Sequence, residues 1–217
     1  MELTRLKANS QYRPCVDEKP YFSWVLTSEK KNVMQTSYHI TVTGPEEVVW
    51  DSGIVESDKS IFVEYAGPPL KSLCEYRWTV TVTDNTGDSA VASSSFETGF
   101  MQKEWSAQWV RSPFPMKKAK KGTGGQNAAE YFRKAFVVRD RVRWARVYAT
   151  CHGAYQLSIN GTRPDDREFA PEFTVYSQYL CYQTYDITPL LQTGENVIGM
   201  LVGDLSLIHI SEPTRRS

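Results

Sequence analysis

The segment EYRWTVTVTD, residues 75–84, alternates strictly between apolar and polar side chains. Tyr76, Trp78, Val80 and Val82 fall on one face of an extended chain, and an arginine and three threonines fall on the other. Successive side chains of a β-strand point to opposite faces of its sheet, so this pattern predicts a half-buried antiparallel strand. Such a strand requires a sheet that has one face against a hydrophobic core.

Several other segments in the first hundred residues also have the composition of strands. They are, in chain order, ELTRLKAN, YFSWVL, SYHITVTG, EVVWDSGIV, SIFVEYAG and ASSSFETG. Turn-forming residues fall among them, at Gly44-Pro45, Asp51-Ser52-Gly53, Gly67-Pro68-Pro69 and Asp84-Asn85-Thr86-Gly87. About seven strands at this spacing predict a small β-sandwich. We expect Trp24 and Trp78 to fill the space between its two sheets.

The β-pattern resumes after a segment rich in lysine, glycine and proline, SPFPMKKAKKGTGGQNAAE, which is typical of a long loop. EYFRKAFVV and WARVYATCHGAYQLSING then supply further strands, and Asn160-Gly161 is a strong signal for a tight hairpin turn. NVIGMLVG is apolar on both faces, which predicts a central strand that is covered on both sides. The second half therefore predicts a second, jelly-roll-like β-sandwich.

Composition excludes several functional classes. Lys+Arg and Asp+Glu are equal at 25 each, so no bulk charge favours nucleic acid or an anionic membrane. No apolar run is long enough to span a bilayer, and the start MELTRLKANSQYRP lacks the apolar region of a signal peptide. Cys15, Cys74, Cys151 and Cys181 show no C-x-x-C spacing, so we expect reduced, mostly buried thiols and a cytoplasmic location.

The residues offer no convincing catalytic centre. Cys151 and His152 are adjacent, and neighbours on a strand project to opposite faces, so they cannot form a nucleophile–base pair. Neither G-x-S-x-G nor H-E-x-x-H occurs. Asp165 and Asp166 lie in a turn-like segment, where we expect them to cap turns or to bind a cation such as calcium together with neighbouring carbonyl groups.

Tyrosines crowd one segment of the second half, where Tyr176, Tyr179 and Tyr182 surround Gln178. Aromatic faces beside amides suit sugars, which present C–H faces and a rim of hydroxyl groups. We therefore select these four residues, together with Trp109, as candidate carbohydrate-binding residues. The alternative is that about half of the tyrosines in this segment belong to the core.

An ordered set of motifs gives the chain a family resemblance. The motifs are PYFSWVL, QTSYHITV, VVWDSGIVES, VEYAGPPLKSLCEYRWTVTVTDNTGDSA, FETG, WSAQWV, YFRKAFVV, ARVYATCHGAYQLSINGTRP, FAPEFTVYSQYLCYQTYDITPLL and GENVIGMLVGD. In this order they resemble the N-terminal portion of bacterial α-L-rhamnosidases of glycoside hydrolase family 78, and the resemblance covers nearly the whole chain up to Asp204. It implies a fibronectin-III-like domain at residues 1–99 and the rhamnosidase N-terminal β-sandwich at residues 100–204.

The resemblance also carries functional expectations. In some family members a related sandwich is a calcium-dependent rhamnose-binding module, and catalysis belongs to a later α/α-barrel whose acidic residues perform inverting hydrolysis. This chain contains none of that barrel. We therefore expect a non-catalytic accessory region of an enzyme that removes terminal L-rhamnose from glycosides or polysaccharides, inactive alone, whose second domain contacts a rhamnose-containing glycan.

The chain departs from the family pattern after Asp204. The family usually continues G-D-G-W-Y, whereas LSLIHISEPTRRS looks like the translation of a sequencing adapter. We expect residues 205–217 to be a non-native tail and the second sandwich to be C-terminally incomplete, which would leave an aggregation-prone sheet edge. The alternative is a genuine strand, LSLIHIS, followed by a polar tail.

Two other functions remain open at this stage. The first is a free-standing carbohydrate-binding or adhesion protein made of two β-sandwiches. The second is the front end of another glycoside hydrolase, because several β-galactosidase-like enzymes carry similar sandwiches.

Overall fold

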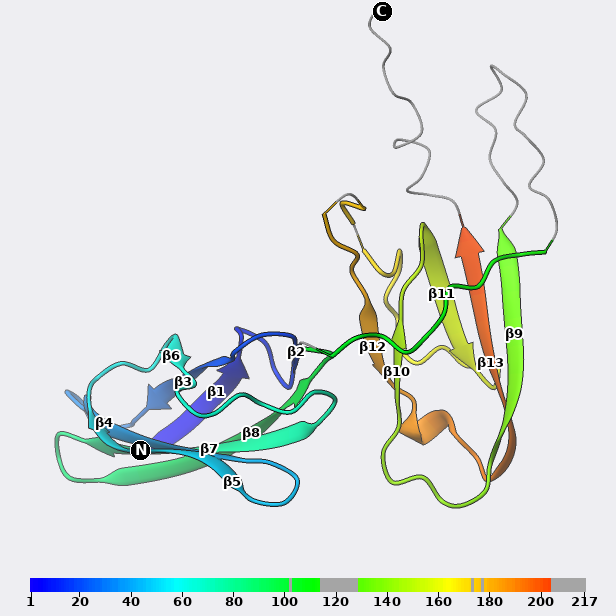
Figure 1. Cartoon of the computed structure of the whole chain (residues 1–217). Coiled ribbons are helices and arrows are strands. Elements are labelled where there is room, and N and C mark those ends of the chain that lie inside the picture. Colours follow the sequence, from blue (N-terminus) through cyan, green and yellow to red (C-terminus); the bar gives the residue numbers. More distant parts are fainter. Residues whose placement is uncertain (102, 114–128, 173, 177, 204–217) are drawn as a thin grey trace, which may run out of the picture. The chain divides into compact units, whose positions relative to one another are not determined.

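The computed structural model describes residues 1–101, 103–113, 129–172, 174–176 and 178–203. Residues 114–128 of the expected loop, which spans residues 112–130, and the expected non-native tail at 205–217 lie outside these residues. The chain divides into two compact units, Met1–Ala107 and Gln108–Ser217. Both are built from strands, which confirms the predicted all-β class (Figure 1). Within the described residues, no helix has the length and apolar character needed to cross a membrane.

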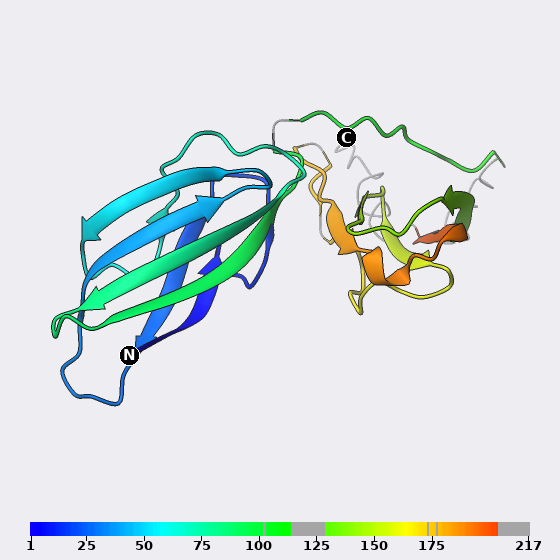
Figure 2. The ribbon, with the colours of Figure 1, turned by 90° about the horizontal axis from the view of Figure 1, so that it is seen from below.

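The first unit contains eight of the described strands in two sheets. They are β1 (Glu2–Ala8), β2 (Cys15–Val16), β3 (Tyr21–Thr27), β4 (Gln35–Thr43), β5 (Val48–Glu56), β6 (Val63–Glu64), β7 (Glu75–Asp84) and β8 (Ser89–Thr98). One sheet has the order β1-β3-β6 and the other β2-β8-β7-β4-β5. Figure 2 shows the two sheets as separate layers, with the cyan and green strands in front of the dark blue ones.

The core of the first unit lies between these sheets. Trp24 and Trp78 are 1% and 0% exposed, which confirms that they fill the interior. Trp24 donates its indole N–H to Gln35 Oε1 at 3.0 Å, and the Gln35 amide donates in turn to the carbonyl groups of Ser57 and Lys59. The polar group that this large side chain brings into the core is thereby satisfied.

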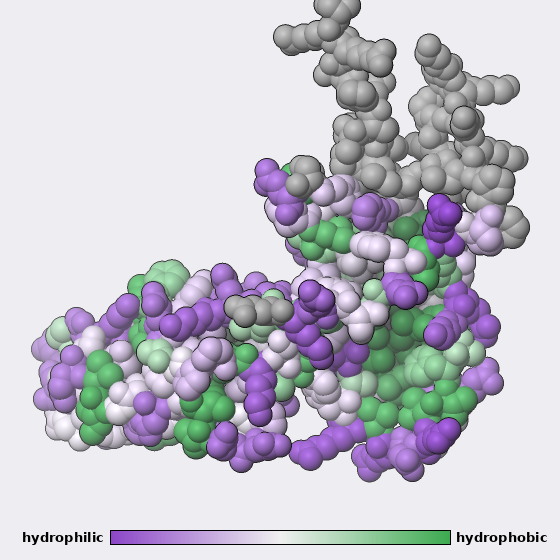
Figure 3. Space-filling view, viewed as in Figure 1, coloured by the Kyte–Doolittle hydropathy of each residue, from purple (hydrophilic) through white to green (hydrophobic). Residues whose placement is uncertain are grey.

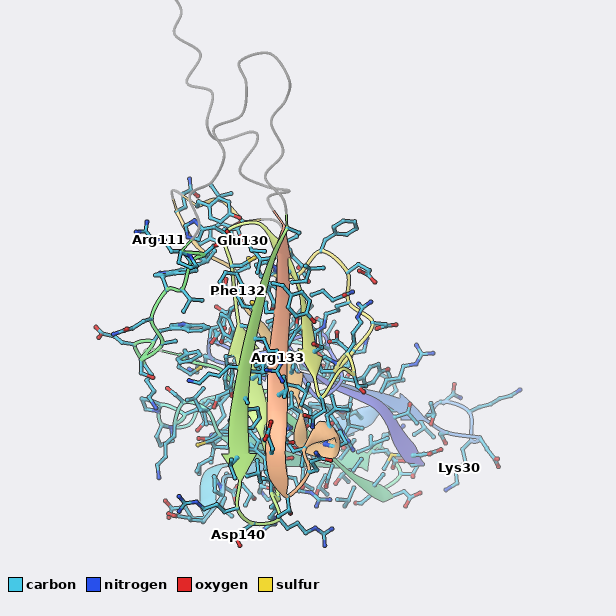
Figure 4. All side chains as sticks on the ribbon, turned by 90° about the vertical axis from the view of Figure 1, so that its right-hand side faces the viewer. Lys30, Arg111, Glu130, Phe132, Arg133 and Asp140 are labelled. Carbon is cyan, nitrogen blue, oxygen red and sulfur yellow. The ribbon has the colours of Figure 1, made fainter. Side chains whose placement is uncertain are left out.

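The second unit contains the remaining described strands. They are β9 (Glu130–Val138), β10 (Arg146–Ala149), β11 (Ala154–Ile159), β12 (Gln183–Asp186) and β13 (Gly194–Gly203), with a 3₁₀ turn, η1, at Thr188–Leu190. One sheet has the order β11-β13-β9 and the other pairs β10 with β12. Figure 4 looks onto β9 and β13, with Glu130, Phe132 and Arg133 following one another along β9.

Strand β13 lies at the centre of its sheet, as its apolar sequence predicts, but it is not covered on both faces by the described residues. Ile198, Met200 and Val202 pack against the core, whereas Leu201 on the other face is 38% exposed. Tyr131 and Val137 on the neighbouring strand β9 are each 68% exposed. The apolar outer face therefore does not mark a second buried layer in the described chain.

The Asn160-Gly161 turn forms with both residues in the left-handed region, at φ +51° and +83°. It closes through a single bridge between Ile159 and Thr162 rather than through a full second strand. The Asn160 side chain accepts a hydrogen bond from Val197 N–H and donates to Leu190 O and to Asn196 Oδ1. These bonds fix the turn against β13.

The cysteines are free in the described structure, as expected, but only Cys151 is buried. Cys15 is exposed, and Cys74 and Cys181 are intermediate. The expectation of mostly buried thiols is therefore wrong, because Cys74 and Cys181 lie in loops and Cys15, in the short strand β2, is exposed.

Candidate functional site

The loop from Thr150 to Gly153 connects β10 in one sheet of the second unit with β11 in the other. Ala154 pairs with Gly203, and Glu130 pairs with Val202, so this loop lies at the end of the unit where β9 begins and β13 ends. In Figure 4, Arg111 lies at the Glu130 end of the unit, away from Asp140. Loops at the ends of a sandwich are common places for binding sites, because the rigid sheets position them.

Three aromatic rings meet at this end of the second unit. The centroid of the Trp109 indole lies 4.8 Å from that of the His152 imidazole, with the planes at 87°. His152 also stacks on Tyr176, at 4.9 Å and 25°. Both separations fall within the range of favourable aromatic pairs. The structure thus brings together two predicted sugar-binding residues, Trp109 and Tyr176, through a histidine between them.

Hydrogen bonds hold the loops that carry these rings. Gly153 N–H donates to the Tyr176 hydroxyl oxygen at 2.8 Å. Thr150 donates to Cys181 O at 2.6 Å, and the Cys181 N–H donates to the hydroxyl of buried Thr174. The aromatic rings therefore rest on a framework that is tied to the core rather than on free loops.

The other predicted sugar-binding residues lie in the same segment but differ in surroundings. The backbone N–H groups of Gln178 and Tyr179 both donate to Val175 O, in the turn that follows Tyr176. Both side chains are exposed, Tyr179 to 51%. Tyr182 is half-buried and faces the ring of Tyr148 at 6.2 Å. Tyr182 therefore contributes to packing.

Tyr185, the last tyrosine of this segment, belongs to the core and is 4% exposed. Its hydroxyl donates to the Tyr155 hydroxyl at 3.0 Å, which donates in turn to Ala149 O. Burial raises the pKa of both tyrosines, so both stay neutral. The expectation that part of the tyrosine cluster is structural holds for this residue.

The two aspartates proposed for a cation lie beside arginines. Arg167 Nε donates to Asp165 Oδ2 at 2.5 Å, and the Arg167 backbone N–H donates to Asp165 Oδ1. The Arg167 guanidinium also bonds Gln183 and lies over the Tyr185 ring. Among the described residues, no group of three or more His, Cys, Asp or Glu side chains could hold a metal ion. The structure thus shows Asp165 in an ion pair, and calcium binding by Asp165 and Asp166 stays a prediction.

Cys151 and His152 take opposite environments, although both lie in the loop between β10 and β11 and not on the strand that the sequence predicts. Cys151 is buried, and burial raises the pKa of its thiol to about 12, which makes it a poor nucleophile. His152 is exposed and belongs to the aromatic cluster. The sequence did not single out His152 as a member of this aromatic cluster, because its two ring partners are distant in the chain and no local motif links them.

The first unit has a surface depression of about 330 Å³ with two acidic residues in its lining. Asp17 and Glu18 are consecutive, and Asp17 Oδ1 accepts a hydrogen bond from Met101 N–H. Glycoside hydrolysis requires two carboxyl groups that flank the scissile bond from opposite sides. Consecutive residues on one wall do not provide that arrangement.

Comparison with known proteins identifies both units. Residues 3–102 match the Rha78A-like N-terminal immunoglobulin domain, and residues 140–206 match the α-L-rhamnosidase N-terminal domain. An α-L-rhamnosidase of Formosa agariphila is 30% identical over 94% of this chain and 24% of that protein.

Solved structures agree with these matches. The α-L-rhamnosidase of Dictyoglumus thermophilum superimposes with a TM-score of 0.82 at 31% identity, over 93% of this chain and 25% of that one. The enzyme of Aspergillus terreus gives 0.81 at 26% identity, over 94% of this chain and 24% of that one. The chain therefore spans about a quarter of the length of the relatives it matches.

Proposed function

Because this chain corresponds to the non-catalytic N-terminal region of the α-L-rhamnosidases, we propose that it serves an enzyme that hydrolyses terminal L-rhamnose from glycosides or polysaccharides. Hydrolysis in this proposal belongs to a catalytic domain in the same polypeptide. The second unit has the role of contacting the rhamnose-containing glycan.

One observation carries this proposal. Two separate matches, at residues 3–102 and 140–206, occur in one chain and both name rhamnosidase domains. The three relatives described above each cover more than nine-tenths of the chain and are α-L-rhamnosidases. These matches favour a rhamnosidase over the front end of a different glycoside hydrolase, and over a free-standing adhesion protein.

A chimeric enzyme tests the proposal. Residues 1–206 of this chain would replace the matching quarter of the Dictyoglumus thermophilum relative. We expect the chimera to release rhamnose from an aryl α-L-rhamnoside with a kcat close to that of the unaltered relative, because the exchanged region takes no part in the chemistry.

On a rhamnose-containing polysaccharide, the chimera should have a lower KM than a version that lacks residues 108–206. An equal KM for the two versions would refute the glycan-contacting role. If the chimera remains folded but has no measurable kcat on the aryl substrate, the proposal that the exchanged region is non-catalytic is refuted.

A further inference from the structure

The Asn160-Gly161 turn carries a chemistry that the proposed function does not use. We propose that Asn160 is a site of spontaneous deamidation, that the folded second unit suppresses the reaction, and that opening of the turn allows it to make the loss of structure irreversible. Asn160-Gly161 is the one Asn-Gly pair in the sequence. Glycine has no side chain to hinder its backbone nitrogen, so asparagine followed by glycine is the most reactive arrangement for deamidation.

The reaction needs only water as a co-reactant. The Gly161 backbone nitrogen attacks the side-chain carbonyl carbon of Asn160, Cγ, so that a new C–N bond forms while the Cγ–Nδ2 bond breaks. Nδ2 takes up the proton that Gly161 loses and leaves as ammonia, and a cyclic succinimide remains. Water then opens the succinimide from either side, which gives aspartate or isoaspartate at position 160. Asn160 and Gly161 are both exposed, so water reaches the turn.

The Asn160 side chain is bonded to partners outside the turn. Its Oδ1 accepts a hydrogen bond from Val197 N–H at 2.8 Å. Its Nδ2 donates to Leu190 O and to Asn196 Oδ1, each at 2.9 Å. A rotation that brings Cγ against the Gly161 nitrogen takes the carboxamide away from these partners. The hydrogen bonds must therefore break before the reaction can begin.

The backbone of the turn is also held in place. Ile159 N–H donates to Thr162 O at 2.8 Å, and Thr162 N–H donates back to Ile159 O at 2.9 Å. Asn160 N–H donates to Val197 O at 2.8 Å. Ile159 and Asn196 are both 0% exposed, which ties the two sides of the turn to the interior. The reactive conformation therefore requires local separation of the turn from β13, not only motion of an exposed side chain.

The product of deamidation cannot restore the turn. An aspartate at position 160 has a carboxylate oxygen in place of Nδ2, and this oxygen would face Leu190 O and Asn196 Oδ1, which are themselves acceptors. Isoaspartate adds a methylene group to the backbone and so disturbs the closure between Ile159 and Thr162. Opening would uncover Ile159 and add it to the green, apolar surface that Figure 3 shows on the second unit. A reversible local opening thereby becomes permanent.

Peptide mapping by mass spectrometry tests the proposal on the full chain. The chain is incubated at mildly alkaline pH, folded and in urea, in heavy-oxygen water so that deamidation during the incubation is distinguished from deamidation during digestion. We expect Asn160 to deamidate at least about tenfold more slowly in the folded chain, because its side-chain hydrogen bonds must first break. Equal rates in the two states would overturn the suppression, and no reaction in urea would overturn the site itself.

Two variants test whether the hydrogen bonds cause the protection. Asn196→Ala removes one acceptor of the Asn160 amide, so deamidation at Asn160 in the folded chain should become about fivefold faster. Thr193→Ala, the matched control at an exposed neighbour, should leave the rate unchanged. Deamidation at Asn9, in the first unit, should be the same in both variants and wild type. An unchanged rate at Asn160 in Asn196→Ala, with circular dichroism showing a folded chain, would refute the role of these bonds. If Asn196→Ala does not fold, the comparison of folded and unfolded wild type decides.

The variant Asn160→Asp tests the structural consequence, because it carries one of the two reaction products. Its urea midpoint should be lower than that of wild type, and hydrogen exchange should show weaker protection of β11 and β13. Protection of β4 and β7 in the first unit should stay the same. A midpoint and a protection pattern equal to those of wild type would overturn the claim that deamidation makes the opening irreversible.

Discussion

Replacement of Asn196 by alanine should destabilise the second unit by about 3 kcal/mol. Asn196 is 0% exposed and makes four hydrogen bonds. Its Oδ1 accepts from Asn160 Nδ2 at 2.9 Å and from Gln192 N–H at 3.0 Å. Its Nδ2 donates to Gln192 O at 2.7 Å and to Gly194 O at 3.0 Å. One buried amide therefore joins the Asn160 turn, the loop after η1 and the start of β13.

The magnitude follows from the number of bonds and from the exposure of the partners. Each bond contributes about 1 kcal/mol, and a buried group left without a partner costs about 1–3 kcal/mol. Asn160, whose side-chain amide bonds Asn196, and Gln192, whose backbone bonds it, are both exposed residues, so water can replace part of what they lose. Asn196→Asp should be worse at neutral pH, because a carboxylate oxygen would face the carbonyl groups of Gln192 and Gly194.

Urea unfolding combined with hydrogen exchange measured by mass spectrometry tests this prediction. The exchange protection of β11 and β13 should fall in Asn196→Ala, while that of β4 and β7 in the first unit should stay unchanged. Thr193→Ala, an exposed neighbour, should change the free energy of unfolding by less than about 0.5 kcal/mol. A loss below about 1 kcal/mol in Asn196→Ala, or an equal loss of protection in both units, would refute the reasoning.

Three shorter predictions follow from the same structure. The pKa of Asp51 is lowered by hydrogen bonds from Gly53 and His39, so the carboxylate stabilises the fold above its unfolded pKa and loses this effect as pH falls through the lower folded value. The urea midpoints of wild type and Asp51→Asn should therefore differ at neutral pH and converge below pH 3.8, and a constant difference would contradict this. Cys151, with its pKa raised to about 12, should resist alkylation at about pH 8 until urea unfolds the chain, and rapid alkylation of the native chain would contradict its burial. The edge strand β9 should promote self-association, so Val137→Lys should lower the weight-average mass measured by sedimentation. A wild-type chain that is monomeric at high concentration would contradict this prediction.

The sequence predicted the strands whose burial follows a local pattern. Strand β7 alternates over its whole length and β4 alternates from Tyr38 to Thr43, and the register of a half-buried strand follows from its apolar face. Strand β2 was missed, because two residues, Cys15 and Val16, pair in parallel with distant Glu97 and Thr98 and carry no pattern of their own. Strand β12 was also hidden, since Gln183 and Thr184 are polar and only Tyr185 points into the core.

The site was predictable in part for a similar reason. Residue types alone selected Trp109 and Tyr176, because aromatic side chains beside amides suit sugars. The contact that joins them depends on His152. The neighbouring residues Cys151 and Gly153 do not reveal that contact, because Trp109 and Tyr176 are distant from His152 in the chain. Asp165 was selected as a cation ligand on its charge, whereas the partner that bonds it, Arg167, became evident from the folded turn.

Rhamnose release from an aryl α-L-rhamnoside by the purified chain tests the central claim most directly. Our account predicts no release above that of a buffer control. The contradicting result is turnover that persists after the chain is purified to homogeneity and that disappears when an acidic residue such as Asp17 is replaced. Such turnover would show that these two β-units carry catalysis themselves.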